Sequence, residues 1–462
     1  MILQDAEWSR KNFGGCKLGN SLRTKRLQSI AVNMLSAPDQ SLPAQNLEDA
    51  DLKALYRLMD QDAVTFEAIA NTHWELTRQN SCERRLLVCD TTDISLHTRN
   101  AVQGLGILGN GNGKGIQLHS CLAINSENGM IEGTAGATLY YRKRAPKSEK
   151  RTERLKRDRE STLWAKVVNQ VGLAPKDKTW IYVFDRGGDN FEAFCAIKSQ
   201  HCQWVIRAGK LNRKVFNSQG EYQWLEEAIK HTTELGQYEL SIRSRPKQPK
   251  RSALLKVSVT SVRFPRPTVT SQEVKAYGTL EIQTNVVIVE EQLKKGSKQK
   301  PIKWILLTSL PTTTFKDAWQ VIEDYEKRWL IEEYHKVLKT GCNIEGHSLR
   351  TTGRLAALIG LISVIGVRLL SLKMHARIEP SEKAIRRVPS TWIEAIAGVR
   401  PRTNIANLTV RGFFHALAKL GGFRGRNGDG DPGWQTIWKG YLRMHWVIEG
   451  MQIRSKKMKK GG

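Results

Sequence analysis

The chain has 462 residues, of which 73 are Lys or Arg and 45 are Asp or Glu, so its formal net charge is +28. An excess of this size predicts a polyanionic partner, most often nucleic acid. A membrane surface is the weaker alternative, because the positive charge is not confined to one amphipathic helix. An apolar fraction of 40% and a charged fraction of 26% exclude wholesale disorder, and the length predicts two to four domains or subdomains.

Three further features favour a cytoplasmic protein that does not span a membrane. The seven cysteines are scattered and form no C-x-x-C pair, which predicts reduced thiols and no zinc site. The longest apolar run, residues 355–367, is shorter than the roughly 20 residues of a membrane-spanning helix and predicts a buried helix. The first ten residues include acids and no apolar signal segment.

The segment up to residue 76 is predicted to be helical. Leu27, Ile30 and Leu35 recur at helical spacing, and basic residues such as Arg23 and Arg26 occupy the other faces. Those faces either bind the DNA backbone or are merely solvated, and the residues by themselves leave both readings open.

Short apolar stretches after residue 84 predict an antiparallel meander. The stretches are residues 86–89, which end at Asp90, then 116–124 and 133–141. Residues 104–109 fit G-x-G-x-x-G but lack the strand-to-helix context of a dinucleotide site, so we expect no nucleotide cofactor.

The charged run over residues 142–160 contains ten Lys or Arg and four Asp or Glu. It predicts a solvated loop or a DNA contact, with neither favoured. A strand over residues 180–184 then ends at Asp185. A helix over 190–200 and a strand over 203–207 complete a β-α-β unit, which indicates a parallel part of the sheet.

From residue 213 to 300, long alternating stretches separated by turns, one of them at 245–247, predict an inserted β subdomain. An apolar strand follows over residues 301–310, and then one long helix from 314 through 339. Another long helix begins near residue 354. The basic tail past residue 453 is expected to be disordered.

Three carboxylates are candidates for metal chemistry. Asp90 and Asp185 each follow an apolar strand, and Glu332 lies on the predicted long helix. Carboxylates held on strands and a helix can bind two Mg²⁺ ions for phosphoryl transfer. One face of that helix also places Glu332 with an aromatic residue and three cations at steps of three and four. The alternative for that face is an exposed, salt-bridged surface. The other members of the face are Tyr325, Arg328, Lys336 and Lys339.

These motifs resemble one family. The Asp90-Thr91-Thr92 start, the turn from Asp185 to Asp189 and the helix over residues 325–339 are similar to bacterial cut-and-paste DDE transposases, in particular the Tn-five type of the IS-four group. The family signature Y-x2-R-x3-E-x6-K is met in full. The resemblance implies an α/β, RNase-H-like catalytic core with an inserted β subdomain, plus helical N- and C-terminal domains.

The resemblance also implies roles for single residues. Asp90, Asp185 and Glu332 would be the catalytic, metal-binding triad for two Mg²⁺ ions, with Mn²⁺ accepted. Contacts to DNA would come from Tyr325, Arg328, Lys336, Lys339, Trp304, Arg207, Lys210, Arg26 and Arg23. Trp304 would stack on a flipped base, although a lone Trp in a strand otherwise favours core packing. Gly209 stands where the family has a lysine, so we assign the DNA contact of that lysine to the next residue, Lys210. Asp93 and Asp189 are either supporting partners of the triad or simple turn residues, and we favour turn residues.

The expected domains are an N-terminal helical DNA-binding domain (1–76), the catalytic core in two parts (77–212 and 301–372) around the β insertion (213–300), and a C-terminal helical dimerisation region with a basic tail (373–462). The expected function is DNA transposition: binding of terminal inverted repeats, metal-dependent cleavage through a hairpin, and strand transfer into target DNA by a homodimer in a synaptic complex. A non-catalytic DNA-binding protein and an RNase-H-fold nuclease without strand transfer are the alternatives.

Overall fold

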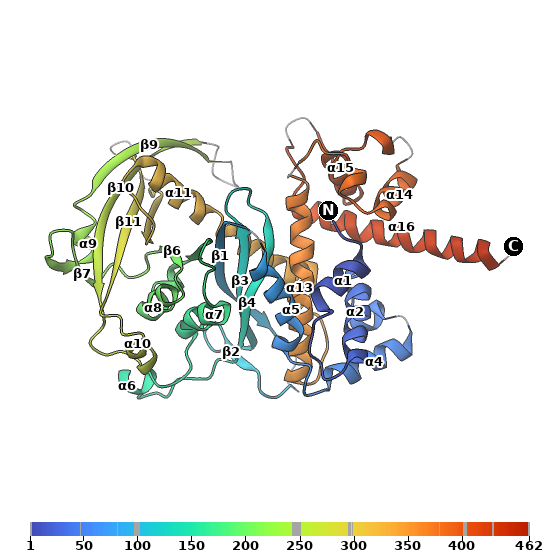
Figure 1. Cartoon of the computed structure of the whole chain (residues 1–462), viewed down its shortest axis with the longest axis horizontal. Helices are drawn as coiled ribbons and strands as arrows, with labels where there is room; N and C mark the ends of the chain where they lie inside the picture. Colours follow the sequence, from blue (N-terminus) through green and yellow to red (C-terminus); the bar gives the residue numbers. More distant parts are fainter. Residues whose placement is uncertain are drawn as a thin grey trace.

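Figure 1 shows the computed structural model of the chain. The structure describes residues 2–460 except 47, 81, 97–101, 243–250, 294–296, 298, 378, 401–403 and 427–428, and it describes side chains up to residue 453. The turn predicted at 245–247 lies outside the described residues. The sheet occupies one end of the molecule and most of the N- and C-terminal helices occupy the other, with the long helix α13 between them (Figure 1). The N-terminal helix α5 lies on the sheet side of α13 and packs against β4.

The helices expected at the N-terminus are present. The Asn20 side chain caps one of them by accepting a hydrogen bond from the N–H of Arg23, and Thr65 caps another in the same way. The last of these helices runs three residues past the predicted limit of 76. The helices are α1 (Asp5–Phe13), α2 (Ser21–Ser36), α3 (Leu42–Gln45), α4 (Asp49–Met59) and α5 (Phe66–Gln79).

The predicted meander is confirmed. Strand β1 (Arg84–Ser95) pairs antiparallel with β3 (Gly113–Asn125), which pairs antiparallel with β4 (Ile131–Tyr140). The glycine-rich segment forms the short strand β2 (Gly106–Leu108), a hairpin partner of β3. A hairpin without a following helix is not a dinucleotide-binding turn.

The β-α-β unit is also confirmed. Strand β5 (Thr179–Phe184) pairs in parallel with β1 on one side and with β6 (Gln203–Arg207) on the other. Helix α8 (Phe191–Ser199) connects β5 to β6, and α7 (Leu163–Val171) packs beside it. Alternation of strand and helix therefore places β1 and β5 side by side, with their carboxyl ends at the same edge.

Residues 213–300 extend the central sheet. Strand β11 pairs with β12 (Lys303–Thr308), and β12 pairs antiparallel with β6 of the core. The described strands form one sheet of twelve, ten of them along the path β2-β3-β1-β5-β6-β12-β11-β10-β7-β8, with β4 paired to β3 and β9 paired to β10 off this path. A separate inserted subdomain therefore stays a prediction. The elements of this segment are β7 (Lys214–Phe216), β8 (Tyr222–Trp224), α9 (Leu225–Ala228), β9 (Thr233–Ile242), β10 (Arg251–Pro265), α10 (Gln272–Ala276) and β11 (Glu281–Glu291).

Helix α13 (Thr352–His375) is the predicted buried helix. Among the described residues it is the one helix long and apolar enough to cross a membrane, yet 89% of its most apolar 18-residue window is buried. It packs against α5, α4 and β4. At Gly360 a Cβ atom would lie 2.9 Å from the carbonyl oxygen of Phe66, so glycine allows the two helices this close approach. The helix is therefore part of the protein core.

The C-terminal region is helical, with α14 (Ser390–Val399), α15 (Val410–Leu420) and α16 (Trp434–Lys460). The expectation of a disordered tail past residue 453 is wrong, because α16 continues to Lys460. Helices α15 and α16 cross with almost no space between their backbones. A Cβ atom on Gly440 would lie 1.8 Å from the carbonyl oxygen of Leu417, and one on Gly421 would lie 1.9 Å from that of Thr436.

Candidate active site

Asp90 lies in the middle of β1. Because β1 continues to Ser95, the prediction that the strand ends at Asp90 is wrong. The strand that ends is the parallel neighbour: β5 pairs with β1 only as far as Cys89, whereas β3 stays paired along the rest of β1. Asp90 therefore lies where β1 loses one neighbour, and its side chain is 20% exposed. Its Oδ1 accepts a hydrogen bond of 2.7 Å from the N–H of Thr91.

Asp185 directly follows β5, as predicted, and caps a short 3-10 helix (Arg186–Gly188). Its Oδ1 accepts a hydrogen bond of 2.7 Å from the N–H of Gly187. Glycine is required at the next position, where a Cβ atom would lie 2.5 Å from the Phe184 ring. This tight turn holds the Asp185 carboxylate at the edge of the sheet that also carries Asp90.

The predicted long helix from 314 through 339 is broken into α11 (Phe315–Glu326), α12 (Trp329–Lys336) and a π-helical turn (Val337–Gly341). At the break, the N–H groups of Arg328, Leu330 and Ile331 bond to the carbonyl three residues back. Such a tight turn places residues i and i+3 directly above each other. The guanidinium carbon of Arg328 accordingly lies 6.0 Å from the centre of the Tyr325 ring.

Arg328 also lies between two of the acids. Its Nη2 is 2.6 Å from Oε1 of Glu332, and its Nη1 is 3.6 Å from Oδ2 of Asp90. The structure thus brings Asp90, Arg328 and Glu332 together from β1 and the signature helix. Within the described part of the chain, no group of three Asp, Glu, His or Cys side chains has an arrangement that could hold a metal ion.

The carboxylates nevertheless influence one another. The pKa of Asp90 is raised to about 6, first by burial and then by the negative charge of Asp185, with a smaller contribution from Glu332. The N–H of Thr91 and the guanidinium of Arg328 act in the opposite direction. A divalent cation would relieve this repulsion, and carboxylate oxygens are its preferred ligands. The donor chemistry of the three acids therefore fits a divalent metal.

An aromatic and basic cluster adjoins Arg328. The ring of Trp304, on β12, meets the ring of Tyr325 edge-on at 5.3 Å. Arg207, at the end of β6, bonds to the Tyr325 hydroxyl and, over 3.4 Å, to the carbonyl oxygen of Lys303. Trp304 is half-buried and packs against the core, as expected of a Trp in an apolar strand, and its stacking on a flipped base stays a prediction. Four predicted DNA-contact residues thus gather next to the acids.

Asp189 does more than form a turn. Its buried carboxylate accepts hydrogen bonds from the N–H groups of Gly209 (2.7 Å) and Lys210 (3.0 Å), and it pairs with Arg213. At Gly209 a Cβ atom would lie 2.8 Å from the carbonyl oxygen of Arg186. The lysine that the family has at this position would not fit here without a shift, whereas Lys210 is exposed.

Lys336 and Lys339 contact residues other than the three acids. The Nζ of Lys336 lies 5.8 Å from the centre of the Trp434 ring, and that of Lys339 lies 3.7 Å from Glu345. The expected alignment of five signature residues on one face therefore holds for the residues around Arg328, whereas the π-helical turn changes the surroundings of Lys339.

Arg23 and Arg26 lie on α2 in the N-terminal helices. Arg26 pairs with Asp51 at 2.6 Å, and Arg23 donates to the Leu18 carbonyl and to the Gln61 side chain. Helix α13 lies between α2 and the sheet that carries the acids (Figure 1). The structure therefore does not bring these two arginines to the acids.

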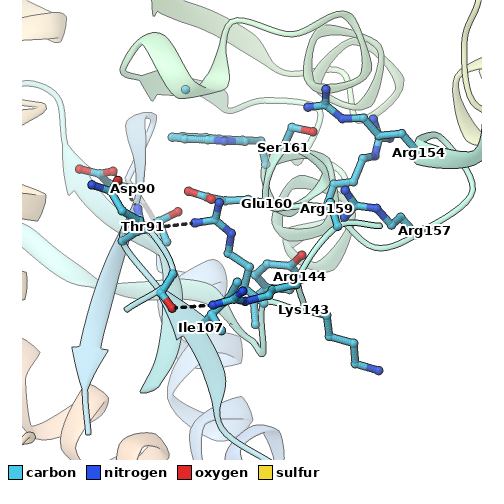
Figure 2. A pocket seen from close by; sticks show the side chains of 18 of the residues that line it. Asp90, Thr91, Ile107, Lys143, Arg144, Arg154, Arg157, Arg159, Glu160 and Ser161 are labelled. Atoms are coloured by element: carbon cyan, nitrogen blue, oxygen red, sulfur yellow. Dashed lines mark hydrogen bonds between the residues drawn. The ribbon is translucent and has the colours of Figure 1, made fainter. Parts of the chain in front are cut away.

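A hollow of 880 Å³ opens beside Asp90 and Asp185. Figure 2 shows its far side, where arginine side chains face the hollow opposite Asp90. We call these residues the basic wall: Arg142, Lys143, Arg144, Lys147, Arg154, Arg157 and Arg159. None of them was predicted individually, although the charge count of residues 142–160 was the signal. The sequence alone does not show which residues of the run lie near the acids. The fold does, because it places the run beside the edge of the sheet that carries the acids.

Two family models match the chain. Residues 155–366 match the transposase DDE domain, and residues 5–64 match the transposase DNA-binding domain. The first range includes Asp185 and Glu332 and begins after Asp90. The catalytic domain makes the chain an enzyme of the polynucleotidyl transferase and endonuclease class. With a DNA-binding domain ahead of it, the chain is a DDE-type DNA transposase that uses divalent metal ions and has DNA as its partner.

Proposed function

We propose that the chain is a cut-and-paste transposase of the Tn-five type in the IS-four group, with Asp90, Asp185 and Glu332 as its catalytic triad. One observation carries the proposal. The three carboxylates come from two adjacent strands and the signature helix. They lie close enough that the negative charges of Asp185 and Glu332 contribute to raising the pKa of Asp90.

The triad would hold two Mg²⁺ ions, or Mn²⁺ in their place. When bound, such ions activate a water or 3′-hydroxyl and stabilise the leaving oxygen. The chain's own contribution is position. The β1–β5 edge fixes Asp90 and Asp185, and the tight turn before α12 fixes Glu332. Asp189 supports the site indirectly, because it ties down the loop that begins next to Arg207.

Phosphates of the transposon end would lie against Arg207, Tyr325 and Arg328, with Lys336 and Lys339 further along the same segment. Trp304 would stack on a base flipped out of the duplex while a hairpin forms. Its half-buried, edge-on contact with Tyr325 supports this role, because that contact leaves Trp304 partly accessible and fixes the position of its ring.

The remaining roles follow from the same resemblance. The N-terminal helices, with Arg23 and Arg26, would bind the terminal repeats, and the C-terminal helices from residue 373 would pair two copies into a synaptic homodimer. The inserted β subdomain would be residues 213–300, within a catalytic core of 77–372. We place the protein in the cytoplasm with its DNA substrate.

The test uses a DNA fragment that carries this gene with its natural flanks. Purified protein with Mg²⁺ is expected to produce nicks, hairpins and joined products on denaturing gels, and Glu332→Gln is expected to abolish all three. Glu333→Gln is the matched control, because Glu333 pairs with Lys373 at 2.7 Å and is given no catalytic role.

Three results would decide against the proposal in different ways. Tight binding without cleavage in Mg²⁺ or Mn²⁺ would indicate the non-catalytic protein. Cleaved ends that never join a target would indicate a nuclease. Cleavage by Glu332→Gln equal to that of the unmodified protein would show that the triad is wrong.

A further inference from the structure

We propose that the basic wall is the docking surface for the target duplex, the DNA into which the cut end is joined. The inference rests on the proposed function, because a strand-transfer enzyme has to hold two DNA segments at its acids at once. One segment ends in the 3′-hydroxyl, and the other supplies the phosphodiester that this hydroxyl attacks.

The acids have two separate basic flanks. On one flank, Arg328 contacts Asp90 and Glu332, and the cluster with Tyr325, Trp304 and Arg207 continues from it. The basic wall forms the other flank, across the hollow that Asp90 and Asp185 line. No residue of the signature helix, nor Trp304 or Arg207, is among the described residues that line this hollow. Two flanks on one acid pair match two DNA segments.

Contacts with the β2–β3 turn hold part of the wall in place. The guanidinium groups of Arg142 and Arg144 donate to the carbonyl oxygens of Gly109 (3.2 Å) and Gly111 (3.5 Å) in the β2–β3 turn. At Gly106 a Cβ atom would lie 2.5 Å from the backbone nitrogen of Arg142, so only glycine allows the two segments to lie this close. The glycine-rich motif that resembled a dinucleotide site therefore positions two arginines beside the hollow.

Several cations of the wall are free to bind phosphate. Arg157 pairs with Glu149 and Arg159 with Glu192. In the described parts of the chain, Lys143, Lys147 and Arg154 form no ion pair, and all three are exposed. These unpaired cations line a hollow that also reaches two of the acids. Such an arrangement favours binding of a polyanion that lies across the hollow.

The contacts that the wall can make favour a target duplex of any sequence over a transposon end that is recognised by its base sequence. Reading base edges in a groove requires an inserted helix or strand pair with suitable side chains. The wall instead consists of loop residues and the four-residue helix α6 (Arg151–Arg154). Its aromatic neighbours are engaged elsewhere: Trp164 is buried, and the Tyr140 hydroxyl donates to the Asp158 carbonyl. Arg and Lys on such a surface bind the backbone of any sequence.

The test compares a wall variant, Lys143→Gln/Lys147→Gln/Arg154→Gln, with a control that removes three exposed charges elsewhere, Lys176→Gln/Lys198→Gln/Lys275→Gln. Pre-cut ends from the gene's natural flanks are joined to a supercoiled plasmid. We expect strand transfer by the wall variant to fall at least tenfold more than end cleavage falls. Raising the plasmid concentration should restore part of the loss, because the defect is in target binding.

A second readout requires no catalysis. Binding of a 40-base-pair duplex of unrelated sequence is measured against salt concentration. Loss of three phosphate contacts should reduce the slope of log K against log salt by about 3, since each contact contributes about 0.9. The control variant should keep the slope of the unmodified protein.

The outcomes separate this proposal from the proposed function. If end cleavage and strand transfer fall in parallel, the wall holds the transposon end and the proposal is wrong. If the wall variant keeps its salt slope and its joining rate, the wall is a solvated face. If the unmodified protein neither cuts nor joins, the proposed function fails, whereas a reduced salt slope would still show that the wall binds DNA.

Discussion

At the scale of single residues, Arg328 has two competing uses. It neutralises Glu332 and Asp90 in the structure, and in the proposed function it binds a DNA phosphate. A guanidinium cannot satisfy both partners fully with one set of donors. Arrival of DNA would therefore draw Arg328 away from the acids and free them for metal.

Replacing Arg328 with Ala should therefore separate metal binding from cleavage. We expect Mn²⁺ to bind the DNA-free variant about tenfold more tightly, a gain of roughly 1.4 kcal/mol, because the competing cation is gone. Cleavage should be lost. Arg207→Ala, which removes a cation that contacts Tyr325 but pairs with none of the acids, should leave Mn²⁺ binding unchanged. Electron paramagnetic resonance of free Mn²⁺ measures both, and equal affinities for Arg328→Ala and the unmodified protein would contradict the idea.

We expect His73 to make the junction between the N-terminal helices and the sheet sensitive to pH. Its Nε2 accepts a hydrogen bond from the N–H of Thr134, and its Nδ1 donates to Asn12 over 2.7 Å. Burial lowers the pKa of His73 to about 4 from an ordinary value of 6.5. Below pH 6.5 His73 is protonated in the unfolded chain but stays neutral in the folded chain. The contribution of neutral His73 to stability is therefore complete above pH 6.5 and is lost as the pH falls toward 4.

Chemical denaturation of the unmodified protein and of His73→Gln at pH 7.5 and pH 5 tests this. The glutamine variant is less stable at pH 7.5, but its free energy of unfolding should fall by about 2 kcal/mol less between the two pH values. Identical losses in the two proteins would show that His73 does not carry the effect.

The acids illustrate what sequence can supply at the residue scale. Asp185 follows its strand as predicted, because an apolar run followed by a turn is a local pattern. Asp90 was located by the same argument, but its strand continues, because pairing with β3 extends past the last apolar residue. The position of Arg328 between two acids depends on packing between β1 and α12, and no local pattern encodes it.

At the scale of elements, the sheet was predicted better than the signature helix. Alternating strands and a helix at ordinary spacing define the meander and the β-α-β unit. The break between α11 and α12 lacks Gly or Pro, so its sequence resembles a continuous helix. A buried ion pair contributes to fixing α11 there: Asp324 is fully buried and bonds Arg84 of β1 through both carboxylate oxygens, at 2.9 and 2.5 Å.

The crossing of α15 and α16 yields a prediction of its own. Gly440→Ala should destabilise the protein by about 1–3 kcal/mol, because the new methyl group overlaps the Leu417 carbonyl. Gly450→Ala on the same helix has nothing within 4 Å of the new methyl group and should stabilise by about 0.5–1 kcal/mol. Urea denaturation of both variants checks the pair, and equal effects would contradict the tight crossing.

At the scale of the whole molecule, the N-terminal helices cover the core. Helix α5 packs on both α13 and β4, and α4 also contacts α13. A chain beginning at residue 80 would expose part of α13, the long apolar core helix. We expect this truncated chain to aggregate, which size-exclusion chromatography would show, even though the DDE match lies wholly within it. A soluble, monodisperse truncated chain would show that α13 does not need this cover.

The continuity of the sheet has a consequence for local motion. β1, β5, β6 and β12 lie in the interior of the strand path, each paired on both sides, whereas β8 is at one end. Backbone amides that open only when the whole domain unfolds exchange with solvent deuterium most slowly. Exchange should therefore be slowest in the strands that carry Asp90 and lead into Asp185, and fastest toward β8. The two acids would be held by the part of the protein that fluctuates least, while the DNA around them moves.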